Sequence, residues 1–327
     1  MGTGTIATEH MVAAIRMLGH EPLWVVSRRR RDAAAFADDL GIPCSTTDLA
    51  RVLRDPAVRF GYVSARVKRR PHYIAALAEA GKHILCDGPI ADRSATARSL
   101  AEMCATKGVV LAVNQTFRDS VIHQTMRRLI DDGEIGAVRS LLIVRGGPHQ
   151  PPPNRRADGD DEAGDLALDI TVNDIDLARF LTGAEPVEVT GIAPPDALGE
   201  HLSYAVRMDD GSIFQAHESF RTAEMESVVI VAGERGGLIA HGTLNGRTSC
   251  TLVRRIGARN ELIPVRERST PLATIRDFVA ADPHGPSWLA TGEDNAIALR
   301  TAEAVVTASR KRRAITLGPG DSRRSTS

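Results

Sequence analysis

The stretch that decides the fold is the start of the chain, Met1-Gly2-Thr3-Gly4-Thr5-Ile6-Ala7. Gly2, Gly4 and Ala7 match G-x-G-x-x-A, the turn that joins a strand to a helix in dinucleotide-binding domains. The first glycine permits a tight turn, the second lets a pyrophosphate approach the backbone, and the small third residue lets the helix pack on the sheet. Free N–H groups at the helix start favour an anion. The motif therefore predicts a phosphate-binding turn made of Gly2, Thr3, Gly4, Thr5 and Ile6.

Short apolar runs and helical stretches alternate after this turn. The runs that read as strands are Leu23–Val26, Phe60–Ser64, Ile84–Cys86 and Val109–Val113. The helical stretches between them are Asp32–Leu40, Pro71–Ala80 and Ser94–Lys107. This alternation is typical of βαβ units and predicts an N-terminal α/β domain with a Rossmann-type parallel sheet.

The turn lacks the strand that normally precedes it, because only Met1 stands before Gly2. In a doubly wound sheet that strand is central, and its absence leaves buried N–H and C=O groups on its neighbours without partners. We expect no strand before Gly2 and a gap of roughly twice the ordinary 4.8 Å strand spacing between Leu23–Val26 and Ile84–Cys86. We also expect the natural protein to carry several apolar residues upstream.

The residues after the second strand indicate which dinucleotide binds. Ser27 lies 20 positions after Ala7, where an NAD enzyme usually carries Asp or Glu for the ribose 2′-hydroxyl. A hydroxyl followed by the guanidinium groups of Arg28 and Arg29 suits a 2′-phosphate, because arginine donates paired hydrogen bonds to phosphate. The alternative is a solvated arginine run that opens the next helix. The pattern favours NADP and leaves NAD possible.

The pattern changes from Arg139 onward. A helix is expected over Leu166–Leu181, and strand-like runs follow from Val187–Ile192 to Leu262–Val265, with a hairpin signal at Asp209-Asp210-Gly211. A late helix begins near Thr291. We therefore predict a Rossmann domain over 1–117, a substrate and oligomerisation α/β domain with a large, mostly antiparallel open sheet over 118–319, and a disordered tail over 320–327.

Composition excludes several classes of protein. The formal net charge is zero, which argues against a nucleic-acid binder. No apolar stretch reaches the roughly 18 residues of a membrane span, and the N-terminus lacks a secretory pattern. The four cysteines are scattered and form no CxxC pair, which fits a reducing cytoplasm better than disulfides or a metal site. We expect a cytoplasmic protein that binds a small molecule and no metal, membrane or nucleic acid.

Several segments, taken in order, resemble the glucose-fructose oxidoreductase / inositol dehydrogenase / rhizopine-catabolism (Gfo/Idh/MocA) family of NAD(P)-dependent oxidoreductases. The matching segments are Gly2–Ala7, Ala80–His83, Asp131–Gly136, Asp174–Leu177, Thr291–Asp294 and Ala302–Ala304. The resemblance implies a Rossmann domain followed by an α/β domain whose large open sheet often forms an oligomer interface. It also implies a sugar, cyclitol or nucleotide-linked sugar as substrate.

The chain departs from this family at both of its catalytic signatures. Asp87-Gly88-Pro89 stands where the family usually shows Glu-Lys-Pro, and that lysine is implied to lie beside the reacting oxygen. In the family's Asp-x-Gly-x-His, Asp169 is kept but Asn173 replaces the histidine. Asparagine forms hydrogen bonds but cannot exchange a proton near neutral pH. Ala65–Arg70 likewise replaces the family's Thr-Pro-Asn-x-x-His.

Three hypotheses follow from these departures. The favoured one is an NADP-dependent oxidoreductase with an altered acid/base set, in which Asp169 handles the proton while Asn173 and Arg118 orient the substrate. The second is a non-redox sensor that binds a dinucleotide and a sugar-like ligand. The third is an elimination or isomerisation with Asp87 or Asp169 as base.

These hypotheses define the candidate site residues. Those for catalysis are Asp169, Asn173 and Asp87. Those for cofactor binding are Gly2, Thr3, Gly4, Thr5, Ile6, Ser27, Arg28, Arg29, Asp87, Pro89 and Arg118. The structural alternatives are that the aspartates cap helices and that Arg118 pairs with an acid.

Overall fold

The computed structural model describes residues 1–3, 10–148, 166–223, 225–244, 250–266, 268–281 and 288–318. Gly4, Thr5 and Ile6 of the expected turn and the expected tail, 320–327, lie outside these residues. The chain divides into two compact units. Among the described residues, the first comprises those within 1–119 and 268–296, and the second comprises those within 120–148, 166–266 and 297–318.

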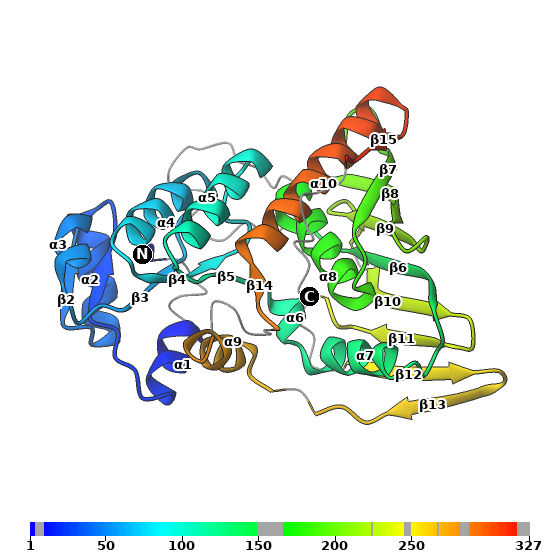
Figure 1. Ribbon diagram of the computed structural model, residues 1–327, viewed down its shortest axis with the longest axis horizontal. Helices are drawn as coiled ribbons and strands as arrows, with labels where there is room; N and C mark the ends of the chain where they lie inside the picture. Colours follow the sequence, from blue (N-terminus) through cyan, green and yellow to red (C-terminus); the bar gives the residue numbers. More distant parts are fainter. Residues whose placement is uncertain are drawn as a thin grey trace. The chain divides into compact units, whose positions relative to one another are not determined.

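The first unit is a sheet between two layers of helices, as Figure 1 shows. Its strands are β1 (Trp24–Val26), β2 (Cys44–Thr46), β3 (Phe60–Val63), β4 (His83–Asp87), β5 (Leu111–Asn114) and β14 (Ala290–Thr291). Its helices are α1 (Val12–Met17), α2 (Arg30–Leu40), α3 (Leu49–Arg54), a 3₁₀ turn Val67–Arg69, α4 (Arg70–Glu79), α5 (Ser94–Thr106), α6 (Thr116–Asp119) and α9 (Thr270–Val279).

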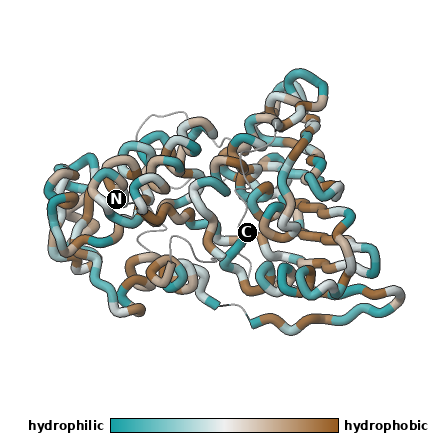
Figure 2. Tube along the Cα trace, viewed as in Figure 1, coloured by the Kyte–Doolittle hydropathy of each residue, from teal (hydrophilic) through white to brown (hydrophobic). Residues whose placement is uncertain are grey.

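Strand β4 lies inside a four-stranded sheet of order β14-β5-β4-β3, in which β3, β4 and β5 are parallel. Its run Ile84-Leu85-Cys86 is fully buried, because helices cover both faces of a parallel sheet. Figure 2 shows this run in the hydrophobic colour. Strands β1 and β2 form a separate parallel pair. The predicted Rossmann-type α/β class is confirmed.

The backbone of Met1 and Gly2 hydrogen-bonds to both of these sheets. The Met1 ammonium donates to the Tyr62 carbonyl at 2.7 Å, and the Met1 carbonyl accepts from Ser64 N–H at 2.9 Å. Gly2 N–H donates to the carbonyl of Val26, the last residue of β1, at 2.9 Å. These two residues therefore link the carboxyl ends of β1 and β3. No strand precedes α1 in the part of the chain that the structure describes.

The expected neighbour of the missing strand was wrong. We placed the gap beside Ile84–Cys86, but that segment pairs with β3 on one side and with β5 on the other. The edge that faces Met1 belongs to β3. The periodicity of the sequence predicts β1, β3, β4 and β5 but not β2, and it carries no information about the order in which strands pair.

The first segment of the first unit ends at Asp119, close to the expected boundary at residue 118, but the second unit is not continuous as expected. Arg268–Ala296 returns to the first unit. The reason is apolar packing: Ile275 and Phe278 of α9 share one buried cluster with Met11, Ala14 and the β4 residue Leu85. A helix 150 residues downstream of the predicted boundary thus completes the core of the first unit.

The second unit is a nine-stranded sheet of order β13-β12-β11-β10-β6-β9-β8-β7-β15, in which only the β6–β9 pair is parallel. Its strands are β6 (Val138–Gly146), β7 (Pro186–Ile192), β8 (His201–Met208), β9 (Ile213–Ser219), β10 (Met225–Gly233), β11 (Gly237–His241), β12 (Thr251–Ile256), β13 (Arg259–Ile263) and β15 (Ile315–Thr316). Its helices are α7 (Val121–Asp131), a π-helical turn Ala167–Thr171, α8 (Val172–Thr182) and most of α10 (Gly292–Lys311).

One face of this large sheet is covered by helices. Buried residues alternate with partly exposed ones along β8 and β10, as expected for a sheet with a single covered face. Figure 1 shows α7 and α8 on that covered face, and α8 is buried along almost its whole length. The predicted large, mostly antiparallel open sheet is confirmed.

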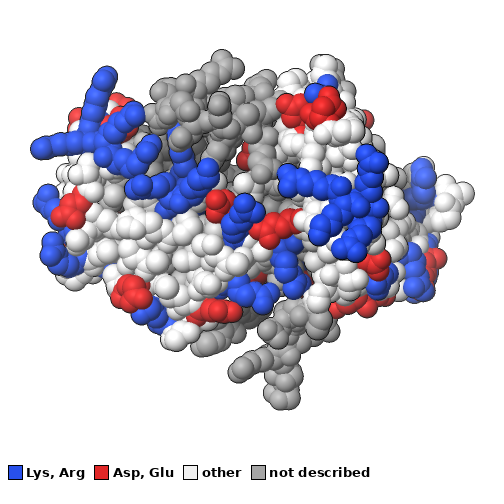
Figure 3. Space-filling model, turned by 90° about the horizontal axis from the view of Figure 1, so that it is seen from above, with Lys and Arg blue, Asp and Glu red and all other residues white. Residues whose placement is uncertain are grey.

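No helix among the described residues is long and apolar enough to cross a membrane. All four cysteines, Cys44, Cys86, Cys104 and Cys250, are free thiols. Basic and acidic side chains are interspersed over the face seen in Figure 3, in keeping with the formal net charge of zero.

Candidate functional site

The carboxyl ends of the parallel strands meet at one edge of the first unit. Asp87 ends β4 and Asn114 ends β5, and the two residues are direct partners in the strand register. Met1 and Gly2 join the ends of β1 and β3 at the same edge. Ligands of open α/β sheets bind outside the carboxyl ends of the strands, so this edge is the candidate cofactor site.

Gly2 lies where no larger residue fits. Its φ is +95°, a backbone conformation that side chains with a Cβ rarely adopt. A Cβ built there would lie 2.7 Å from the backbone N of Ala65 and 2.8 Å from the backbone of Ser64. Glycine at this position thus allows the chain to pass close to the backbone of Ser64 and Ala65. Thr3 follows it and is half-buried, and the next three motif residues are not described.

Asp87 is held by two neighbouring strands. Its Oδ1 accepts hydrogen bonds from the Tyr62 hydroxyl at 2.8 Å and from Asn114 Nδ2 at 3.0 Å, and the residue is 7% exposed. Burial and the adjacent Asp87 carboxylate raise the pKa of Tyr62 far above its ordinary value, so the phenol stays a donor. This network ties β3, β4 and β5 together at the candidate site.

The Gly88–Pro89 turn is held through its backbone. Its peptide bond is cis. Arg70 donates to the Pro89 carbonyl at 2.6 Å and to the Ala65 carbonyl at 2.8 Å, and Ile90 N–H donates to Asn295 Oδ1 at 2.9 Å. Arg70 is the residue that stands in place of the family's histidine in Ala65–Arg70, and here it fixes the turn.

The expected 2′-phosphate residues follow β1 directly. Ser27 N–H donates to the Thr46 carbonyl at 3.3 Å, which holds the loop against β2. Arg28 and Arg29 are exposed, and Arg29 immediately precedes α2. All three lie after the carboxyl end of β1, the end at which Gly2 binds Val26.

Arg118 is mostly buried rather than solvated. It is 7% exposed, and its guanidinium lies 3.3 Å from the Asp294 carboxylate at the start of α10. Asp294 Oδ2 also accepts from the N–H and hydroxyl of Thr291. The Arg118 guanidinium therefore helps to hold the start of α10 within the first unit.

Asp169 and Asn173 lie in the second unit, on the π-helical turn and the first turn of α8. Both are half-buried. Asn173 Nδ2 donates to the backbone carbonyl of Asp169 at 2.9 Å, not to its carboxylate. The spacing of four residues places them on one face of the helix.

A buried polar cluster lies directly behind these two residues, and sequence reasoning missed it. Arg145 on β6 lies 3.1 Å from Asp174 Oδ1, while Glu218 on β9 accepts hydrogen bonds from Thr171 and, at 2.7 Å, from Tyr204. Burial raises the pKa of Asp174 to about 6 and raises that of Glu218 well above its ordinary value. The polar residues Arg145 and Glu218 at inward positions of apolar strands were the available signal.

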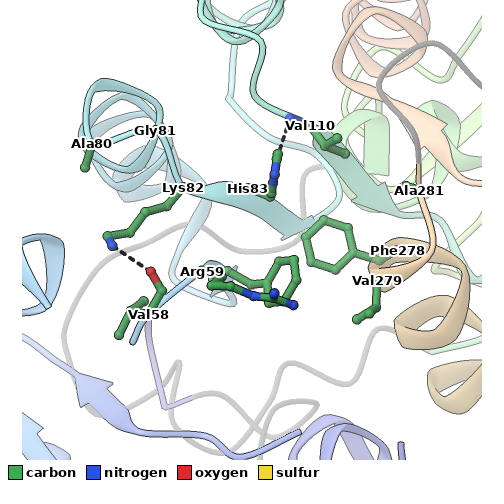
Figure 4. A pocket seen from close by; sticks show the side chains of 11 residues that line it. Val58, Arg59, Ala80, Gly81, Lys82, His83, Val110, Phe278, Val279 and Ala281 are labelled. Atoms are coloured by element: carbon green, nitrogen blue, oxygen red, sulfur yellow. Dashed lines mark hydrogen bonds between the residues drawn. The ribbon is translucent and has the colours of Figure 1, made fainter. Parts of the chain in front are cut away.

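A cavity of about 440 Å³ lies at the opposite edge of the first unit, where β3 and β4 begin. In Figure 4 the Lys82 side chain points toward Val58. Its ammonium donates hydrogen bonds to the Val58 carbonyl at 2.6 Å and to the Asp55 carbonyl at 3.0 Å. His83 Nδ1 accepts from Val110 N–H at 3.1 Å. None of the predicted site residues lines this cavity, and the Lys82 ammonium is hydrogen-bonded to two backbone carbonyls.

Two family models match the chain. Residues 1–115 match the oxidoreductase family with an NAD-binding Rossmann fold, and residues 123–239 match the Gfo/Idh/MocA C-terminal domain. The chain belongs to the Gfo/Idh/MocA family of oxidoreductases.

Curated relatives match the Gfo/Idh/MocA chain over nearly its whole length. The 1,5-anhydro-D-fructose reductase of Ensifer adhaerens is 32% identical over 318 residues, which covers 94% of each chain. The inositol 2-dehydrogenase of Rhizobium meliloti is 26% identical over 336 residues, covering 97% of this chain and 98% of that protein. Among solved structures, an aldose-aldose oxidoreductase from Caulobacter crescentus has a TM-score of 0.83 at 20% identity, covering 96% and 97% of the two chains, and shares the fold.

The residues of this Gfo/Idh/MocA oxidoreductase fit a nicotinamide dinucleotide. Gly2 lies between the carboxyl ends of β1 and β3, and Ser27 and Asp87 lie at the same edge of the strands. In the described residues no group of three or more His, Cys, Asp or Glu side chains is placed to hold a metal ion. Gly2, Ser27 and Asp87 are therefore placed where a dinucleotide binds in this type of domain.

Proposed function

We propose that this chain is an NADP-dependent dehydrogenase or reductase that acts on a sugar, cyclitol or nucleotide-linked sugar with a reduced acid/base set. The observation that carries the proposal is the pair of polar residues Asp169, on the turn before α8, and Asn173, in the first turn of α8, in a family member that has Gly88 at the lysine position. The names of the relatives, a reductase of anhydrofructose and a dehydrogenase of inositol, support this substrate class.

Each residue has a distinct proposed role. Bound NADP would accept or supply the hydride. Asp169 would accept the hydroxyl proton as an alcohol carbon becomes a carbonyl, and would return it in the reverse direction. Asn173 would hydrogen-bond the substrate, since an amide orients but does not exchange protons. Arg118 would orient the substrate, and Asp87 and Pro89 would shape the cofactor site.

A hydride-transfer assay tests the proposal. The purified chain would be mixed with NADPH or NADP and with 1,5-anhydro-D-fructose, myo-inositol or D-xylose, and nicotinamide absorbance would be followed. We expect a slow but measurable change with at least one of these substrates. If NADPH binds and no polyol or ketosugar changes its absorbance, a non-redox sensor becomes the better account.

Cofactor choice gives a separate prediction. Replacing Arg28 and Arg29 by alanine is expected to raise the Kd of NADPH by about tenfold or more, because a charge-assisted hydrogen bond contributes about 1.5–3 kcal/mol. The Kd of NADH should change little. The matched control is alanine at the exposed Arg310 and Arg313, which removes the same charge near the end of α10. Equal affinity of the parent protein for NADPH and NADH would contradict the NADP assignment.

We further propose a homo-oligomer formed through the large sheet. Its face away from α7 and α8 carries a row of partly exposed apolar residues in register across four strands. The row consists of Leu142, Ile230, Ile239 and Val253. A contiguous apolar face of this kind favours burial against a second copy. Light scattering of the purified chain is expected to give a mass of at least two copies, and a monomer at working concentration would exclude this interface.

A cytoplasmic location accompanies this function. The four free thiols support it, because thiols stay reduced in that compartment.

A further inference from the structure

We infer that the side-chain amide of Gln115 is a substrate-binding group of this enzyme, which donates a hydrogen bond to an oxygen of the sugar or cyclitol beside Gly88. The inference rests on the proposed function and adds a specificity-determining residue to it. It is carried by a buried amide without a partner among the described residues, by the close approach of that amide to Gly88, and by the position of both at the carboxyl edge of the strands.

The backbone places Gln115 directly after β5. Its N–H donates to the Val113 carbonyl at 2.9 Å, and its carbonyl accepts from Arg118 N–H at 3.0 Å. Both main-chain groups are therefore paired. The preceding residue, Asn114, binds Asp87 across the two strands, which fixes where the Gln115 side chain begins.

The side chain of Gln115 is 5% exposed, and its Nε2 has no hydrogen-bond partner among the described residues. A buried donor without an acceptor destabilises the unliganded protein, because the group has lost its water and gained nothing in return. Such groups persist at sites where a ligand supplies the missing partner. The neighbouring carboxylate of Asp87 accepts hydrogen bonds from Tyr62 and Asn114 and none from this amide.

The amide lies against the position that lacks a side chain. A Cβ built on Gly88 would lie 3.1 Å from Gln115 Nε2 and 3.4 Å from Val113 Cγ1. Any side chain at residue 88 would press on the amide, so glycine at this position lets the amide lie against the turn. A neutral amide donor suits a hydroxyl or carbonyl oxygen, and it binds that oxygen without moving a proton.

The main test is Gln115→Met, which keeps the length of the side chain and removes the amide. We expect the melting temperature of the unliganded protein to rise, because the unpaired donor is gone. We expect the KM for the best probe among 1,5-anhydro-D-fructose, myo-inositol and D-xylose to rise about tenfold, the value of one good hydrogen bond. The Kd of NADPH should stay unchanged. A structural amide would not produce these opposite effects on stability and KM.

The matched control is Gln124→Met. Gln124 on α7 is buried to the same degree, at 6% exposed, and is not among the buried side chains whose polar atoms lack a partner. The same substitution there should lower the melting temperature and leave KM unchanged. Gly88→Ala supplies a second variant, since its Cβ displaces the amide without altering Gln115, and it should also raise KM.

The outcomes separate this inference from the proposed function. If the parent turns over a substrate and both Gln115→Met and Gly88→Ala have the same KM as the parent, the role of Gln115 is rejected. The proposed function is not affected by that result. A rise in the Kd of NADPH without a rise in KM would place the acceptor on the cofactor and also reject it. A parent protein that neither turns over nor binds any probe in calorimetry would reject both.

Discussion

Asp169→Asn is expected to lower turnover by about two to four orders of magnitude, the usual loss when a general acid/base group is removed. Gly88 and Asn173 offer no group that exchanges a proton near neutral pH, so the proposal leaves Asp169 to carry the proton. The substitution keeps the size of the side chain. It also keeps the hydrogen bond from Asn173, because that bond goes to the backbone carbonyl of Asp169.

The measurement is kcat for the best substrate of the parent, together with the melting temperature. The melting temperature is expected to stay close to that of the parent, so that a loss of turnover reports chemistry and not unfolding. Asp196→Asn, on the exposed side chain of a loop residue, serves as the charge-matched control. Hydride transfer that is unchanged in Asp169→Asn would show that another group handles the proton.

Arg145→Met is expected to lower the free energy of unfolding by about 3–5 kcal/mol, the cost of leaving a buried charge without its partner. Arg145 is the cation in a cluster that also holds Asp174 and Glu218, both of which are fully buried. Without the guanidinium, Asp174 must either keep an uncompensated charge or take up a proton. Arg207→Met, which breaks the exposed pair with Glu188, should cost less than about 1 kcal/mol.

The pH dependence of stability checks the same cluster. The pKa of Asp174 rises from 3.8 to about 6 on folding, so the folded chain binds the proton more tightly than the unfolded chain. The contribution of this carboxyl to stability is therefore present at low pH and is lost as the pH rises from 3.8 through about 6. The pKa of Glu218 is also raised, so the loss of stability continues to higher pH.

Glu218→Gln tests that sign. Its amide resembles the protonated carboxyl: the oxygen accepts from the Tyr204 hydroxyl, and the NH2 group donates to the oxygen of the Thr171 hydroxyl, which then acts as acceptor. We therefore expect a loss below about 1 kcal/mol near pH 7 and a weaker dependence on pH. Unfolding in urea at pH 5 and pH 8 measures both quantities. A parent protein whose stability rises over this interval, with Arg145→Met equal to the control Arg207→Met, would contradict the account.

Much of the site could be named from the sequence, because its signals are local. The glycine motif, the run Ser27-Arg28-Arg29 and the two altered catalytic signatures each lie within a few consecutive residues. The structure adds that the backbone of Ser64 and Ala65 passes close to Gly2. Gln115 and the Arg145–Asp174–Glu218 cluster were not predicted. Arg145 and Glu218 are polar residues at inward positions of apolar strands, but the sequence does not indicate which segments come together to pair them.

The amino-acid sequence by itself determined the alternation of strands and helices, the family, and the absence of the family's lysine and histidine. These features depend on residue identity and on periods of two and 3.6 residues, which are properties of the chain alone. Only the tertiary structure decided that β3, and not β4, faces Met1, that α9 completes the core of the first unit, and that the amide of Gln115 lies against Gly88. Each of these depends on contacts between segments far apart in the sequence, and burial and steric fit select those contacts only once the chain has folded.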